Sequence, residues 1–106
     1  MTYYLIAEAN VRDKEGFNQK FAAVGMHLCK ECHGEYLARG YENAICVRGV
    51  PPESNVMLAR FPDLDCLNDY LKKLDPLIEK IGKKCADFRI VAIEGLLVNM
   101  AGRQTT

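Results

Sequence analysis

The sequence predicts a single α+β domain in which a four-stranded antiparallel sheet carries its helices on one face. Three observations lead to this prediction. The chain has 106 residues, the size of one domain. Two segments, near residues 17–28 and 64–74, carry apolar residues at helical spacing. Four segments rich in aliphatic and aromatic residues flank them in the order strand, helix, strand, strand, helix, strand. That order is the ferredoxin-like βαββαβ arrangement.

The first half of the chain predicts one strand, one helix and an interrupted strand. Residues 3–11 read as the first strand, and Asp13 can cap a helix that runs to about residue 30. The apolar face of this helix is formed by Phe17, Phe21, Val24 and Leu28. Gly34 ends the helical segment, and a second strand over 35–39 and 44–47 is interrupted near Gly40.

The second half begins with a proline-rich loop over 51–55 and a third strand over 56–61. Asp63 predicts the cap of a second helix, whose apolar stripe consists of Leu64, Leu67, Leu71 and Leu74. Asp75 and Pro76 predict that the second helix stops and that a short third helix begins, which Gly82 ends. The last strand is expected over 88–97. One domain over 1–106 follows, with a core of about 3–97 and a frayed tail over 102–106.

Composition limits the classes of partner and compartment. Fourteen basic residues balance fourteen acidic ones, so no net field attracts nucleic acid or an anionic membrane surface. No apolar run approaches the roughly 20 residues of a membrane span, and no secretory signal is visible. Five cysteines, an odd number, are typical of a reduced compartment. We therefore expect a cytoplasmic protein.

The helix-free face of the predicted sheet needs a cover. The first strand places apolar residues on both of its sides, with Leu5 on one and Ile6 on the other. A second copy of the chain would bury the spare face symmetrically. The sequence therefore predicts a homodimer packed sheet to sheet.

The same segments resemble a known family. The resemblance spans about residues 3–97 and is carried by Tyr4–Ala7, Asp13, Gly34–Gly40, Phe61–Leu64 and Ala86–Gly95. On these residues the chain is similar to domain of unknown function 1330, within the dimeric α+β barrel superfamily. The resemblance implies a homodimer and no agreed activity. The superfamily includes cofactor-free monooxygenases, haem-degrading enzymes, lactone isomerases and stress-response proteins, so its fold names no reaction.

Two positions depart from the pattern of that family. His33 stands where a second glycine is usual, and Gly82 aligns with an arginine that often precedes the last strand. Any role of that arginine is therefore not carried over to this chain.

The string Cys29-Lys30-Glu31-Cys32-His33 is the most specific local motif. C-x-x-C-H attaches c-type haem in other proteins, but that attachment needs an extracytoplasmic maturation route. If the helix extends through His33, the two thiols and the imidazole share one face and could hold a metal ion such as zinc. The alternative is two ordinary thiols and a surface histidine near a helix end.

Charged residues on three adjacent strands suggest a second site. Glu8, Arg60 and Glu94 are expected on one face of the sheet, where an arginine between two carboxylates could support acid–base catalysis. The alternative is a salt-bridge cluster at the strand ends.

A cavity between helices and sheet could take a small organic molecule without a cofactor. Arg39 is a possible anion contact and Tyr36 a possible aromatic lining, so both are predicted substrate-binding residues. The sequence contains no Gly-rich phosphate loop and no serine nucleophile elbow. The resulting hypothesis is a small-molecule-binding protein, with cofactor-independent monooxygenase or isomerase activity as its enzymatic form. A thiol, metal or haem module at Cys29, Cys32 and His33 is the alternative.

Overall fold

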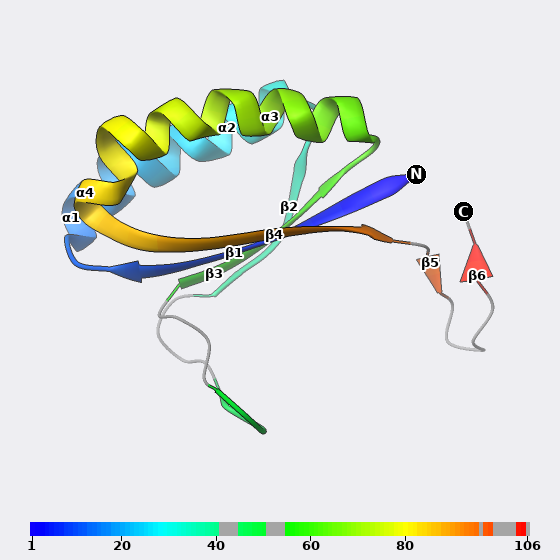
Figure 1. The fold of residues 1–106 in the computed structure, drawn as a ribbon, viewed down its shortest axis with the longest axis horizontal. Helices are drawn as coiled ribbons and strands as arrows, with labels where there is room; N and C mark the ends of the chain where they lie inside the picture. The colour runs from blue at the N-terminus through cyan, green and yellow to red at the C-terminus, as the bar shows by residue number, and fades with distance from the viewer. Residues whose placement is uncertain (41–44, 51–54, 96, 99–103, 106) are drawn as a thin grey trace.

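A computed structural model describes residues 1–40, 45–50, 55–95, 97–98 and 104–105. Its main sheet has four antiparallel strands in the order β2-β3-β1-β4. These are β1 (Thr2–Val11), β2 (Glu35–Gly40), β3 (Asn55–Phe61) and β4 (Ala86–Gly95). Figure 1 shows both helical segments on one side of this sheet. The ferredoxin-like α+β fold expected from the sequence is confirmed.

The first helical segment is continuous from residue 14 to residue 31. It consists of α1 (Lys14–Gly16), the π-helical η1 (Phe17–Ala22) and α2 (Ala23–Glu31). The Asp13 side chain accepts a hydrogen bond from the Gly16 backbone N–H at 3.0 Å, which confirms the predicted cap. Phe17 and Phe21 are buried against the sheet, as the helical spacing predicts.

The second helical segment shows that the predicted restart at Asp75-Pro76 is wrong. The segment consists of α3 (Leu64–Leu77), the π-helical η2 (Ile78–Gly82) and α4 (Lys83–Cys85), and Pro76 lies inside α3. Leu74 is buried before the proline, and Ile78 and Ile81 pack on the same core after it. This continuous packing compensates for the roughly 3 kcal/mol that an internal proline costs. Gly82 likewise does not end the helix. The predicted Asp63 cap is confirmed, because its side chain accepts from the Cys66 N–H at 2.8 Å.

Two predicted strands have different bounds in the structure. The second strand ends at Gly40, and residues 45–47 are not a strand, because β3 already pairs with β2 through Gly40 and offers them no partner. Residue 44 and residues 51–54 of the predicted loop lie outside the described residues. The strand predicted over 88–97 is β4, which begins two residues earlier than expected and ends at Gly95, and Leu97 belongs to a separate short strand.

The predicted frayed tail is also partly wrong. Its residues Gln104–Thr105 form β6, which pairs with β5 (Leu97–Val98) in a separate two-stranded sheet. This hairpin lies beyond the end of β4 (Figure 1). The rest of that tail lies outside the described residues.

The core lies between the helices and the sheet. Its largest fully buried side chains are Leu5, Cys29, Phe61 and Tyr70. The Phe61 and Tyr70 rings pack with their centroids 5.1 Å apart, so the third strand is joined to α3 by an aromatic contact. Within the described residues, no helix is long and apolar enough to cross a membrane.

Candidate functional site: a cavity between the helices and the sheet

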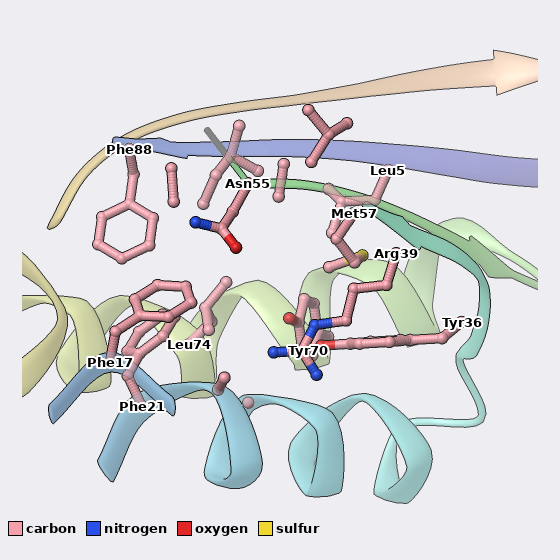
Figure 2. Close-up of a pocket in the computed structure, with 16 residues that line it drawn as sticks. Leu5, Phe17, Phe21, Tyr36, Arg39, Asn55, Met57, Tyr70, Leu74 and Phe88 are labelled. Carbon is pink, nitrogen blue, oxygen red and sulfur yellow. The ribbon is translucent and has the colours of Figure 1, made fainter. Parts of the chain in front are cut away.

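A cavity lies between the helices and the sheet (Figure 2). All four strands contribute to it, β1 and β2 along much of their length and β3 and β4 near their first residues. Its lining consists of Leu5, Ala7, Ala9, Phe17, Phe21, Ala22, Gly25, Tyr36, Arg39, Asn55, Val56, Met57, Tyr70, Leu74, Phe88 and Ile90. Most of these side chains are apolar, and the polar ones gather on β2, the start of β3 and α3.

A β-bulge in β2 places both predicted substrate-binding residues in this cavity. Tyr36 pairs with Ala59 and Arg39 pairs with Met57, while the register shifts between Tyr36 and Ala38. In a regular strand, residues three apart point to opposite faces. The extra residue in the bulge therefore turns Arg39 to the helix side, where Tyr36 already lies. Without this irregularity the two side chains would be separated by the sheet.

The polar end of the cavity combines two phenols and a guanidinium. A side-chain hydrogen bond joins Tyr36 and Tyr70. Burial raises the pKa of Tyr36 to about 12. The positive charge of Arg39 favours the phenolate and so partly opposes this rise in the pKa of Tyr36. Burial raises the pKa of Tyr70 still further. Both phenols are therefore protonated at neutral pH, and the Arg39 guanidinium is close enough to influence one of them.

The opposite end of the cavity is aromatic. Phe17 and Phe21, one helical turn apart in η1, have ring centroids 5.5 Å apart. Phe88 at the start of β4 lies 4.9 Å from Phe21 and 6.2 Å from Phe17, centroid to centroid. Figure 2 shows the three rings together on the side away from Arg39 and Tyr36. The cavity therefore has a polar end and an apolar end, an arrangement that can orient an amphipathic molecule.

Gly25 in α2 provides part of the free space. It is buried, and an added Cβ would have one neighbour within 4 Å, the Leu74 Cδ1 atom at 4.0 Å. Neither a close approach nor a positive φ requires glycine here. Glycine inside a helix costs about 1 kcal/mol relative to alanine. The missing methyl group thus weakens the helix and leaves its volume to the cavity.

The cavity is small in this conformation. Its free volume is about 60 Å³, and the whole hollow, open mouth included, measures about 590 Å³. A water molecule needs about 10–15 Å³ of such free volume, so the inner part holds roughly four to six small groups. Chemically, the site offers hydrogen-bond donors, one positive charge and an apolar surface.

The structure does not bring Glu8, Arg60 and Glu94 together. Glu94 lies opposite Tyr3 on the helix side of the sheet and accepts a hydrogen bond from its hydroxyl at 3.3 Å. Glu8 lies on the outer face opposite Val56, four residues along β3 from Arg60, which is about 13 Å of strand. The expectation of one shared face is therefore wrong. The reason is the register of β4, which the sequence does not reveal and which a slip of one residue reverses.

Glu8 and Arg60 have separate ion-pair partners on the outer face. The Arg89 Nη1 atom lies 3.2 Å from the Glu8 carboxylate, and the Arg60 Nη2 atom lies 2.5 Å from that of Glu35. The hydrogen bond and charge of Glu35 raise the pKa of Arg60. Within one chain, these two residues form exposed ion pairs rather than an acid–base pair.

The Cys29-x-x-Cys32-His33 string forms the end of a helix. The helix ends at Glu31 with Cys32 as its C-cap, and His33 has a φ of 63° in the left-handed region. The Gly34 N–H donates to the Cys29 carbonyl at 2.8 Å, and the His33 N–H donates to the Lys30 carbonyl at 3.1 Å. These two bonds define a Schellman motif, in which glycine is the usual residue at the position of His33.

This geometry separates the imidazole from the two thiols. Cys29 and Cys32 are buried, whereas His33 is exposed beside Tyr4, Glu35 and Arg60. The expected helical face of three ligands is wrong, because His33 leaves the helix. Burial, followed by the nearby Cys32 thiol, raises the pKa of Cys29 to about 11, which disfavours the reactive thiolate.

The described part of the chain contains no group of three or more His, Cys, Asp or Glu side chains that could hold a metal ion. All five cysteines lie in that part, and each is a free thiol.

Sequence reasoning missed several members of the cavity. Tyr70 is spaced three residues after Leu67 on the apolar stripe of α3, so it reads as an ordinary core residue. Asn55 reads as part of a loop. A signal for Tyr70 is its hydroxyl, because a buried tyrosine usually has a hydrogen-bond partner nearby.

Comparison with solved structures identifies the fold but no activity. A protein of unknown function from Rhodopseudomonas palustris superposes with a TM-score of 0.68 at 12% identity, over 91% of this chain and 83% of that one. An uncharacterized NIPSNAP-like domain protein from Burkholderia xenovorans superposes with a TM-score of 0.53 at 12% identity, over 99% and 92% of the two chains. No protein-family model and no curated protein matches this chain. These similarities concern the fold alone, and the neighbours are themselves uncharacterised.

Proposed function

We propose that this protein binds a small organic molecule in the cavity between its helices and its sheet. The observation that supports the proposal best is the convergence of Tyr36, Tyr70 and Arg39 on one end of a mostly apolar cavity. Ligand sites commonly combine an apolar lining with a few placed polar groups. The β2 bulge favours the same interpretation, because bulges often re-aim side chains next to functional sites.

The free volume limits the ligand. The inner cavity takes roughly four to six non-hydrogen atoms, and a larger molecule would extend into the open part of the hollow. Typical drug-sized sites have volumes of about 300–1,000 Å³. We therefore expect a compact metabolite-sized ligand rather than a nucleotide or a large cofactor.

A screen of small organic compounds by protein-observed NMR tests the proposal. Binding should shift the backbone amide signals of Gly25, Tyr36 and Phe88, which come from three different elements around the cavity. Gly25→Ala should weaken binding at least fivefold, because its methyl group takes up cavity volume. Asn18→Ala is the control, since it also adds alanine to the first helical segment but lies exposed and outside the lining.

Two results would contradict the proposal. One is a broad screen in which no compound shifts the cavity signals. The other is binding that Gly25→Ala and Asn18→Ala leave equally unchanged.

We also propose that the protein forms a homodimer through the outer face of the sheet. The resemblance to domain of unknown function 1330 implies a homodimer as well. Leu37, Leu58 and Ile93 are 44%, 38% and 50% exposed, and by register and bulge they extend the outer face around Ile6. The Glu8–Arg89 and Glu35–Arg60 pairs lie toward the two ends of that face. Stable specific dimers bury about 1,200–2,000 Å² with an apolar centre and a polar rim.

Light scattering at micromolar concentration tests the dimer. We expect twice the mass of one chain for the wild type and a single-chain mass for Leu58→Lys, which places a charge in the apolar centre. A monomeric wild-type protein would exclude this part of the proposal.

Cofactor-independent catalysis, of monooxygenase or isomerase kind, is the enzymatic form of this function. It is supported by the two protonated phenols, which could donate to negative charge that develops on a bound substrate. A cytoplasmic location is supported by the five free thiols. Incubation of each bound compound with the protein, followed by product analysis, tests for turnover; Tyr36→Phe should lower the rate constant more than the affinity.

A further inference from the structure

We infer that the ligand of the cavity is a small organic acid, with its carboxylate at Arg39 and the two tyrosines and its apolar body toward the phenylalanine cluster. The inference rests on the proposed binding function and adds the chemical class and the orientation of the ligand. Figure 2 shows the arrangement, with Arg39, Tyr36 and Tyr70 on one side and Phe17, Phe21 and Phe88 on the other.

The charge of the lining favours an anion. Among the described residues that line the cavity, Arg39 is the only charged side chain. Arg39 already has an interaction within the protein, and a ligand would share the five N–H donors of its guanidinium with that partner. Arginine and carboxylate form short, charge-assisted and often bidentate hydrogen bonds. In a half-buried site these bonds are stronger than in water, because the surroundings are less polarisable.

The tyrosine pair favours the same ligand class. Both phenols keep their protons well above neutral pH, so between them they present hydroxyl donors rather than a phenolate. The hydrogen bond between the hydroxyls uses one of their two donors and leaves the other for a carboxylate oxygen. A cationic ligand would be repelled by the Arg39 charge, which disfavours amines.

The far end of the cavity selects the body of the acid. The three phenylalanines, together with Ala22 and Leu74, offer no hydrogen-bonding side chain. The amide of Asn55 lies near Phe88 and already has an interaction within the protein (Figure 2). A second charged group at this end would lose its hydration without an oppositely charged partner among the described lining residues, at considerable cost. A monocarboxylate with a short aliphatic or flat aromatic body therefore fits better than a dicarboxylate or a phosphate ester.

The β2 bulge determines this selectivity. It turns Arg39 to the cavity, whereas a regular β2 would turn it to the outer face. The ligand class thus depends on a backbone irregularity that places the Arg39 guanidinium at the polar end of the cavity.

Matched acid and amide probes test the inference. Butyrate and butanamide have the same number of non-hydrogen atoms and differ in charge, as do benzoate and benzamide. In low-salt buffer, NMR titration should show each acid binding at least tenfold more tightly than its amide. Arg39→Gln should remove that preference, and Tyr36→Phe should weaken the acid alone by several fold. Arg48→Gln is the control, because it removes an equal charge from an exposed position outside the lining.

The outcomes separate the inference from the proposed function. If acid and amide shift the cavity signals with equal affinity, or if neutral compounds bind and acids do not, the inference is wrong and the binding function stands. If Arg39→Gln and Arg48→Gln lower acid affinity equally, the preference comes from net charge and the inference is also wrong. If no acid, amide or other compound affects the cavity signals, the proposed function itself fails. A folded spectrum of each variant, recorded first, shows that the comparison concerns intact protein.

Discussion

On the helix side of the sheet Arg39 lies beside the half-buried Tyr36 and the buried Tyr70, whereas on the outer face Arg60 and Arg89 are bound to glutamates in solvent-accessible pairs. The same residue type therefore has different surroundings on the two faces. An exposed ion pair is weak and is screened by salt, while a charge in an apolar cavity strongly prefers an oppositely charged ligand. A charged residue on a strand therefore indicates a candidate site only when its side chain lies on the face that lines the cavity.

The largest difference between the faces should be in side-chain packing. Phe61 on the helix side is fully buried, and Phe61→Ala should lower the free energy of unfolding by about 3–5 kcal/mol because it leaves a cavity beside Tyr70. Leu58→Ala on the outer face of the same strand is the comparison, and it should cost clearly less in the monomer. Urea unfolding of both variants measures this difference. Equal losses would mean that the outer face is packed as tightly as the core.

Alkaline pH should destabilise the helix side specifically. Burial raises the pKa of Cys29 to about 11 and that of Tyr36 to about 12, from ordinary values of 9.0 and 10.0. The unfolded chain therefore ionises first, and the stabilisation is present below about pH 9 and is lost as pH rises through 11 and 12. Urea midpoints measured from pH 8 to 12 should fall along this range. Tyr36→Phe should reduce the slope, and an unchanged slope would contradict the assignment.

A smaller effect of opposite sign, a gain in stability, is expected for a substitution at His33, which lies between α2 and β2. A non-glycine residue in the left-handed region costs about 1–2 kcal/mol. Glycine removes this strain, but its greater conformational freedom in the unfolded chain offsets part of the gain in stability. His33→Gly should therefore stabilise the protein by about 0.5–1 kcal/mol in thermal or urea unfolding. A loss of stability would show that the exposed imidazole makes a contact more valuable than the strain it carries.

The smallest effect should come from the outer ion pairs. Arg60→Met removes the partner of Glu35, and we expect a slight loss of stability at low salt that disappears at high salt. Urea unfolding at two salt concentrations measures it. A large loss that persists in salt would indicate that Arg60 lies in a buried interface, as a sheet-to-sheet dimer could provide.

Prediction from sequence succeeded where the signal is local. The Asp13 and Asp63 caps are confirmed, because a capping side chain bonds to a backbone N–H three residues away. The continuity of α3 through Pro76 was missed, because distant packing outweighs a local helix-breaking tendency. The metal face at Cys29, Cys32 and His33 was wrong for a related reason, since one left-handed residue ends the helix that the spacing assumed.

The sequence by itself determined the order of elements, their two periodicities and the α+β fold, because these depend on residues within one or two turns of each other. Only the tertiary structure decided which side chains meet. The register of β4 moved Glu94 away from Glu8 and Arg60, and the β2 bulge brought Arg39 to Tyr36 and Tyr70. Both depend on pairing between strands that are distant along the chain. A shift of one residue in such a pairing moves every side chain of the strand to the other face of the sheet, and no local sequence pattern predicts that shift.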